Sequence, residues 1–127
     1  MKAFVPNYQL VMPESLQDAL NLLSKSSHHK LMAGGTDLMV LFERGQLPEG
    51  NYLSLQKIYE LKGFDVFRDK LIIKSGTTFD EIMAHEIVAK EFPMLKMAAD
   101  VTGAKAIQNR GTLGGNIANA SPAADSP

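Results

Sequence analysis

The first fifty-odd residues alternate between short apolar runs and stretches with apolar residues at helical spacing. Leu10-Val11 is a short apolar run that Pro13 ends, which predicts a strand. A helix should follow, since Ser15 with Asp18 resembles a capping box in which Asp replaces the usual Glu. Its predicted apolar face has the i, i+3, i+4, i+7 pattern and consists of Leu16, Ala19, Leu20 and Leu23.

The same order of elements then repeats. Residues 30–33 form a second short apolar run, and a helix is expected from about Asp37 through Leu38, Leu41 and Phe42. Gly45 stands where a helix commonly ends on a residue in the left-handed conformation. Residues 52–55 predict a third strand. Strands that alternate with helices favour parallel β-α-β pairing.

The pattern changes after residue 57. Residues 65–67 and 71–74 are apolar runs on either side of a polar turn, which predicts an antiparallel hairpin. Thr78 and Glu81 form a second capping box at the start of another expected helix.

A last helix is predicted over residues 94–101, with Gly103 as its stop. The fold class is therefore expected to be α+β. A small parallel α/β subdomain should occupy residues 1–57, and residues 58–127 should begin an antiparallel α+β subdomain.

Composition narrows the class of protein. Hydrophobic residues make up 45% of the 127 residues, which is enough for a folded core, and the net charge of -1 gives no basic excess for nucleic-acid or membrane-surface binding. The absence of cysteine excludes disulfides, thiolate nucleophiles and iron–sulfur ligation within this sequence. We find no signal-peptide pattern and no apolar run of membrane-spanning length, and expect a cytoplasmic protein.

Two double glycines carry the candidate chemistry. Gly34-Gly35 stands between a predicted strand and a helix, where glycine allows close backbone approach and the helix N-terminus attracts anions. Thr36 is expected to cap that helix and offer its hydroxyl to the same anion. Gly114-Gly115 is interpreted as a second such loop, to which Thr112 adds a hydroxyl and Asn116 an amide.

Two loops of this kind could clamp a pyrophosphate, which suits a dinucleotide. Each double glycine alone is more often only a tight turn, and neither known phosphate motif, G-x-x-x-x-G-K-[ST] or G-x-G-x-x-G, is present. The three histidines have no spacing that indicates a metal site, and no nucleophile–base set can be drawn. Redox chemistry would therefore need a cofactor.

Residues 31–38, Leu-Met-Ala-Gly-Gly-Thr-Asp-Leu, resemble the first flavin-binding loop of the FAD-binding medium subunits of molybdenum hydroxylases, the xanthine dehydrogenase and aerobic carbon monoxide dehydrogenase family. Residues 109–125 resemble the second loop, and residues 13–23 the first helix. The resemblance extends along essentially the whole chain. It implies an FAD-binding domain of the vanillyl-alcohol-oxidase (PCMH) type, with FAD between the two subdomains.

The resemblance also implies the cofactor-binding residues. FAD would be held noncovalently, because there is no cysteine and no histidine beside either loop. No catalytic residue and no metal ligand is expected. The implied FAD contacts are Ala33, Gly34, Gly35, Thr36, Asp37, Thr112, Gly114, Gly115, Asn116, Ser121 and Asp125.

The implied function is electron transfer in a complex of several subunits. A large subunit would hold the molybdenum–pterin cofactor, and a small subunit would carry 2Fe–2S clusters that pass electrons to FAD and on to NAD or another acceptor. Relatives have an Arg where this chain has Gln108, so one anchoring contact should be weaker, with Arg110 compensating in part. Relatives also continue past Pro127, and we expect this chain to be the N-terminal part of such a protein.

Two other hypotheses remain. The chain could be a non-catalytic remnant that keeps the fold without binding FAD, or a flavin oxidoreductase that works alone. A gene product that continues past Pro127 favours the subunit over the remnant. Activity without partners would indicate the independent enzyme.

Overall fold

The computed structural model describes residues 7–26 and 28–122. A three-stranded sheet comes first in the chain and is built from β1 (Tyr8–Val11), β2 (Lys30–Met32) and β3 (Gly50–Ser54). The strand order is β1-β3-β2, and β3 pairs in parallel with both neighbours. The predicted small parallel sheet is therefore confirmed.

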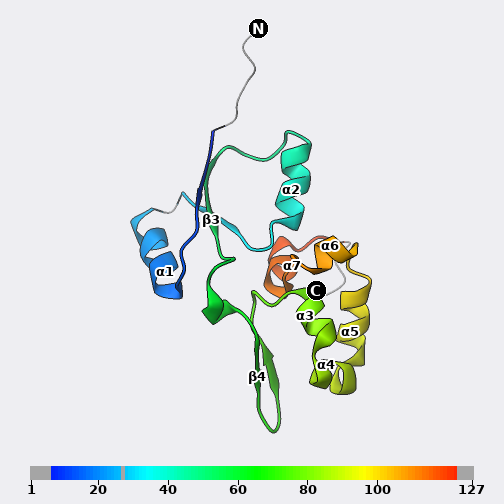
Figure 1. Cartoon of the computed structure of the whole chain (residues 1–127). Coiled ribbons are helices and arrows are strands. Elements are labelled where there is room, and N and C mark those ends of the chain that lie inside the picture. Colours follow the sequence, from blue (N-terminus) through cyan, green and yellow to red (C-terminus); the bar gives the residue numbers. More distant parts are fainter. Residues whose placement is uncertain (1–6, 27, 123–127) are drawn as a thin grey trace.

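Two helices cover opposite sides of this sheet (Figure 1). The first, α1 (Leu16–Lys25), begins at Ser15, whose Oγ accepts the Asp18 N–H at 3.1 Å as predicted. The second, α2 (Thr36–Glu43), ends just before Gly45, which has the expected positive φ of 67°.

The start of α2 differs from the prediction. Gly35 is the N-cap residue, with φ 74°, and no side chain caps the helix. Thr36 is already the first helical residue, so its expected capping role is wrong. Glycine adopts this left-handed conformation at less cost than residues with a Cβ, which explains the glycine at position 35.

Each face of the sheet has its own core. On the α1 side, Ala19, Leu53 and Ile58 are fully buried. Leu20 was expected on the same helix face, but its side chain is 51% exposed; Leu22 packs against the cluster instead. The α2 side is aromatic: Tyr8 lies between Tyr52 and Phe42, with ring centroids 6.3 and 5.8 Å away.

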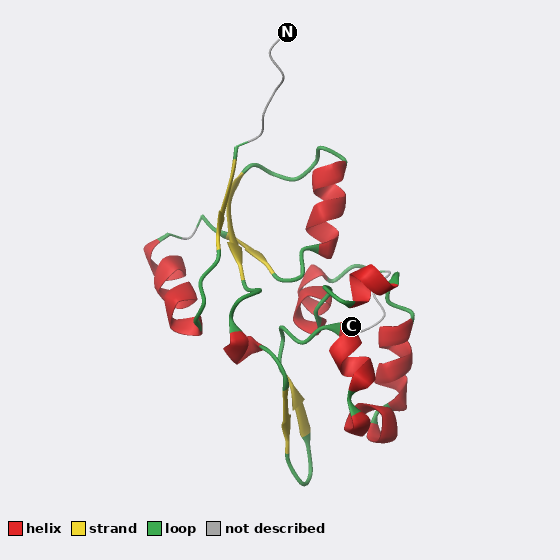
Figure 2. Cartoon of the chain, viewed as in Figure 1, coloured by secondary structure: helices red, strands yellow, loops and turns green. Residues whose placement is uncertain are grey.

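The second half of the chain contains a hairpin and a group of short helices (Figure 2). A 3-10 turn, η1 (Tyr59–Leu61), leads into antiparallel β4 (Phe64–Val66) and β5 (Leu71–Ile73), which confirms the hairpin. The helices are α3 (Phe79–Ala84), α4 (Glu86–Glu91), α5 (Pro93–Asp100), α6 (Lys105–Gln108) and α7 (Leu113–Asn119).

Helix α3 begins with the predicted capping box. The Glu81 N–H donates to Thr78 Oγ1 at 3.2 Å, and the Thr78 N–H donates to Glu81 Oε2 at 2.9 Å. The core of this half is formed by the helices α3, α4 and α5, and its buried residues are Phe79, Ile82, Val88 and Ala99. Partly buried side chains of the hairpin, including Phe64 and Ile73, pack against it.

The sequence did not predict α4, α6 or α7. The correction that matters is α7, because residues 111–116 were interpreted as a loop. Thr112 caps α7 through its side chain, so Gly114, Gly115 and Asn116 are helical. Within the described part of the chain, no helix is long and apolar enough to cross a membrane.

Candidate functional site

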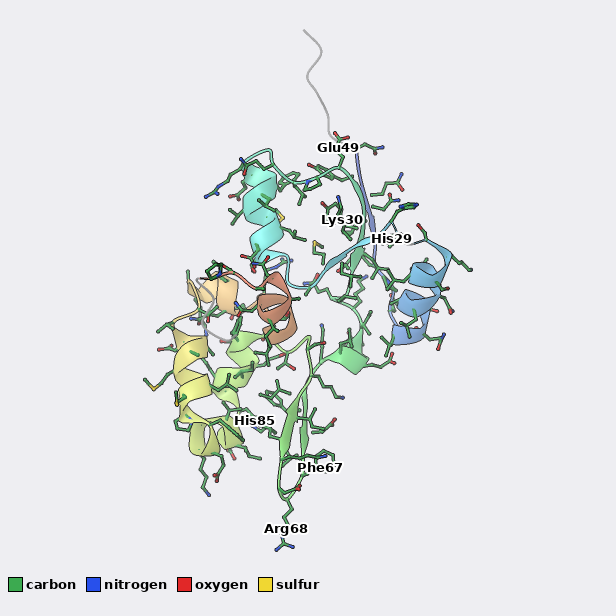
Figure 3. The ribbon with its side chains drawn as sticks, turned by 180° about the vertical axis from the view of Figure 1, so that it is seen from behind. His29, Lys30, Glu49, Phe67, Arg68 and His85 are labelled. Atoms are coloured by element: carbon green, nitrogen blue, oxygen red, sulfur yellow. The ribbon has the colours of Figure 1, made fainter. Side chains whose placement is uncertain are left out.

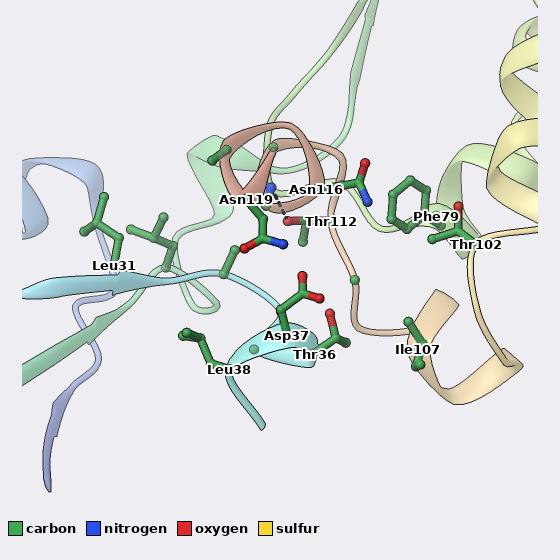
Figure 4. A pocket seen from close by; sticks show the side chains of 18 residues that line it. Leu31, Thr36, Asp37, Leu38, Phe79, Thr102, Ile107, Thr112, Asn116 and Asn119 are labelled. Carbon is green, nitrogen blue, oxygen red and sulfur yellow. Dashed lines mark hydrogen bonds between the residues drawn. The ribbon is translucent and has the colours of Figure 1, made fainter. Parts of the chain in front are cut away.

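A cleft of about 390 Å³ lies between the first turn of α2 and helix α7 (Figure 4). Nine of the eleven predicted binding residues line it: Ala33, Gly34, Gly35, Thr36, Asp37, Thr112, Gly114, Gly115 and Asn116. Ser121 follows α7 and is not part of the lining, and Asp125 lies outside the described residues. The two double glycines are eighty positions apart in the sequence, and both line this cleft.

The two segments meet at Gly34, which is buried. A Cβ on Gly34 would overlap the carbonyl oxygen of Arg110 and lie 3.1 Å from the Cα of Gly111. The Arg110 Nε also donates to the Gly34 carbonyl oxygen at 3.3 Å. Gly34 is therefore required for the backbones of the two halves to approach each other.

Gly35 and the first turn of α2 form the open side of the cleft. The first N–H groups of a helix have no acceptor within the helix, and α2 has no side-chain cap to supply one. Across residues 7–26 and 28–122, no backbone carbonyl accepts from Gly35, Thr36 or Asp37. These donors, with the positive end of the helix dipole, suit an anion.

The corresponding N–H groups of α7 are already used. Leu113 donates to the Thr77 carbonyl at 3.0 Å and Gly114 to the Ser75 carbonyl at 2.9 Å. Gly115 donates to Thr112 Oγ1 at 3.0 Å. The prediction that the second double glycine offers N–H groups in the same way as the first is therefore wrong. The backbone of this second double glycine forms part of the wall of the cleft.

The cleft has apolar ends and a polar middle. Figure 4 shows Leu31 and Leu38 at one end and Phe79 with Ile107 at the other. Between them lie polar side chains from α2 and α7, and Figure 4 labels Thr36, Asp37, Thr112 and Asn119. An elongated ligand with a ring at each end and an anionic centre matches this arrangement.

Sequence reasoning missed the end of the cleft formed by Phe79, Thr102 and Ile107. These residues come from the start of α3, the end of α5 and the short helix α6. No local pattern links them, because only the packing of three separate segments brings them together. The capping box at Thr78 did predict a helix start beside Phe79, but not its position next to Thr112.

Gln108, where the resemblance implied an Arg, does not line the cleft. Its side chain is 7% exposed, and its Nε2 donates to the Asp100 carbonyl at 2.8 Å, at the end of α5. Its observed contact is thus internal to the protein. Arg110 borders a second cavity of about 260 Å³, which shares Gly34 and Thr112 with the cleft.

In the part of the chain that the structure describes, His85 and Tyr52 lie outside the lining of the cleft. Among the described residues, no group of three His, Asp or Glu side chains could hold a metal ion. His85 stacks against Phe64 with ring centroids 4.1 Å apart, close to the hairpin (Figure 3). Burial, with Tyr8 nearby, raises the pKa of Tyr52, which belongs to the core beneath α2.

Comparison with known proteins agrees with this geometry. The family model "FAD binding domain in molybdopterin dehydrogenase" matches residues 6–127. The glyceraldehyde dehydrogenase medium chain of Sulfolobus acidocaldarius is 30% identical over 98% of this chain and 44% of its own length. The xanthine dehydrogenase FAD-binding subunit of Escherichia coli O157:H7 is 34% identical over 88% of this chain and 39% of its own length.

Solved structures show the same likeness. A chain of reconstituted CO dehydrogenase from Oligotropha carboxidovorans has a TM-score of 0.85 and 26% identity, and the match covers 100% of this chain and 44% of that one. The predicted α+β fold of an FAD-binding domain is therefore confirmed. The chain spans less than half the length of these relatives.

Proposed function

We propose that this chain, which belongs to the family of FAD-binding domains in molybdopterin dehydrogenases, binds FAD in the cleft between α2 and α7. The observation that carries the proposal is the uncapped start of α2, whose first N–H groups have no acceptor among the described residues. This helix start and the second glycine segment line the same cleft. A pyrophosphate fits those donors, and the apolar ends of the cleft suit the two ring systems of FAD.

The residues present fit the cofactor. Gly35, Thr36 and Asp37 would hold the pyrophosphate through their backbone N–H groups, opposite Thr112 and Asn116. Because α2 has no cap of its own, an anion at this position supplies the missing acceptor. When bound, FAD supplies reversible electron transfer, which none of the amino-acid side chains here provides.

We extend the proposal to the role of the complete protein. Similar chains are subunits of xanthine and carbon monoxide dehydrogenases, so we infer a flavin subunit that works with a large molybdenum–pterin subunit and a small iron–sulfur subunit. In that role it relays electrons from the iron–sulfur clusters to NAD or another acceptor. The subdomain division at residue 57, the contacts of Ser121 and Asp125, and a cytoplasmic location stay predictions.

Titration of the 127-residue chain with FAD tests the proposal. Circular dichroism first establishes that the chain is folded, and flavin fluorescence then follows binding. ADP and riboflavin serve as ligands that keep only one part of FAD. Saturable FAD binding that ADP competes away supports the cleft as the site. A folded chain that binds neither FAD nor ADP would support the remnant hypothesis and reject cofactor binding by this chain.

A further inference from the structure

Arg110 contacts Gly34 through both its backbone and its side chain. Its backbone carbonyl lies where a Cβ of Gly34 would be, and its side-chain Nε donates to the Gly34 carbonyl oxygen at 3.3 Å. This side-chain hydrogen bond joins the segment before α2 to the segment before α7. Arg110 therefore acts on the Gly34–Gly35 peptide group.

That peptide group lies where the two cavities adjoin. Gly34 lines both of them, whereas Gly35 lines only the cleft and Arg110 lines only the second cavity. The described chain contains no cis peptide bond, so the carbonyl and the N–H of this peptide point in opposite directions. With the carbonyl oxygen held toward Arg110, the N–H of Gly35 points away from Arg110, and Gly35 itself lines the cleft.

The conformation of Gly35 shows why this peptide needs to be held. N-cap residues usually have extended backbone with negative φ, whereas Gly35 has φ 74°. Neither Gly34 nor Gly35 has a Cβ to restrict rotation of the peptide plane between them. A rotated peptide would bring φ of Gly35 to a negative value, which is less strained, and turn the carbonyl oxygen away from Arg110 and toward the cleft, where it would repel an anion.

We propose that Arg110 is a positioning residue that keeps the Gly34–Gly35 peptide oriented with its N–H toward the cofactor pyrophosphate. The proposal rests on the proposed function, since it assigns Arg110 a role in the same site. It differs from direct charge attraction, because Arg110 borders the second cavity and acts through the Gly34 carbonyl.

The test compares Arg110→Gln with Arg68→Gln, which removes the same charge at the tip of the hairpin (Figure 3). Dissociation constants are measured for FAD, ADP and riboflavin at low and high salt. We expect Arg110→Gln to weaken FAD and ADP about tenfold, the equivalent of one hydrogen bond. Riboflavin binding should not change, because riboflavin has no pyrophosphate. Arg68→Gln should match the wild type, and Arg110→Lys should recover part of the loss.

The second measurement needs no cofactor. In the chain without FAD, the NMR resonances of the Gly34 carbonyl carbon and the Gly35 amide report the orientation of the peptide. Arg110→Gln should shift both, while Arg68→Gln should leave them in place. A stable fold in all variants is checked by thermal unfolding.

The two measurements separate the possible failures. Equal FAD affinity for Arg110→Gln and the wild type would overturn the proposal. A second result would also overturn the proposal. If the loss of FAD affinity disappears at high salt and in Arg110→Lys, and the Gly34 and Gly35 resonances do not shift in Arg110→Gln, Arg110 acts by direct charge attraction. If the wild type binds no FAD, the proposed function fails, and the resonances alone decide: a shift upholds the orienting role of Arg110, and no shift overturns it.

Discussion

The two double glycines of this chain look alike in the sequence and differ in the structure. Each stands at the start of a helix, α2 or α7. Among the described residues, the first N–H groups of α2 have no acceptor, whereas those of α7 donate to the carbonyls of Thr77 and Ser75 and to the hydroxyl of Thr112. A double glycine at the start of a helix can therefore mark an anion site or a packing site, and the surrounding hydrogen-bond acceptors decide which.

The glycines within each pair also differ. Gly34 and Gly114 allow close packing: a Cβ on the first would overlap Arg110, and a Cβ on the second would lie 2.7 Å from the Ser75 oxygen. Gly35 is required for its positive φ. The cleft thus depends on glycine for two physical reasons, close backbone approach and left-handed conformation.

Replacing Gly34 tests the packing role and should have the largest effect on stability. In Gly34→Ala the new Cβ meets backbone atoms of Arg110, which cannot move aside as a side chain could. We expect the free energy of unfolding to fall by about 3 kcal/mol, at the upper end for overpacking, with loss of FAD binding. Urea unfolding measures it. An unchanged midpoint would show that the two halves do not depend on this contact.

Replacing Gly35 tests whether the uncapped start of α2 binds the cofactor. In Gly35→Val the β-branched residue disfavours φ 74°, so the N–H that faces the cleft is displaced. FAD affinity should fall roughly a hundredfold, or about 3 kcal/mol, while the fold is largely kept. Gly35→Asn is the matched control, because Asn tolerates this conformation and should keep most of the affinity. Equal losses in both variants would contradict a conformational role.

The sequence predicted those elements whose signals are local. The capping box of Thr78 and Glu81 and the alternation of strands and helices need only neighbouring residues, and both predictions are confirmed. Helix α7 was missed because glycine costs about 1 kcal/mol in a helix relative to alanine. Its N-terminus forms because distant carbonyls, of Ser75 and Thr77, accept its N–H groups.

The same distinction holds for the candidate site. The two glycine segments and their joint binding of a pyrophosphate could be proposed from the residues themselves, and the resemblance added the identity of the cofactor as FAD. The end of the cleft at Phe79 and Ile107 could not be predicted, because it depends on how α3 and α6 pack. The internal role of Gln108 is equally non-local: its amide binds the carbonyl of Asp100, eight residues earlier.

Removing the cap of α7 should affect stability more than binding. In Thr112→Val the hydroxyl that accepts the Gly115 N–H is lost, and one helix-terminal donor has no partner. Loss of such a cap lowers the free energy of unfolding by about 1 kcal/mol. Thermal unfolding measures the loss, and Thr112→Ser is the control that keeps the hydroxyl. A variant of full stability with strongly reduced FAD affinity would instead make Thr112 a direct ligand.

The smallest effect on stability and on FAD affinity is expected from removing the charge of Asp37. The Asp37 side chain is exposed in the first turn of α2 and lines the cleft. Its negative charge therefore stabilises the helix through the helix dipole but repels a bound pyrophosphate. Asp37→Asn should lower the free energy of unfolding by about 0.5 kcal/mol. It should also tighten FAD and ADP binding about threefold at low salt, with less gain at high salt.

Riboflavin affinity should stay the same, because the gain comes from the pyrophosphate alone. If Asp37→Asn instead weakened binding of all three ligands, its carboxylate would be a hydrogen-bond partner of the flavin part of the cofactor, and the anionic centre would have to lie elsewhere in the cleft.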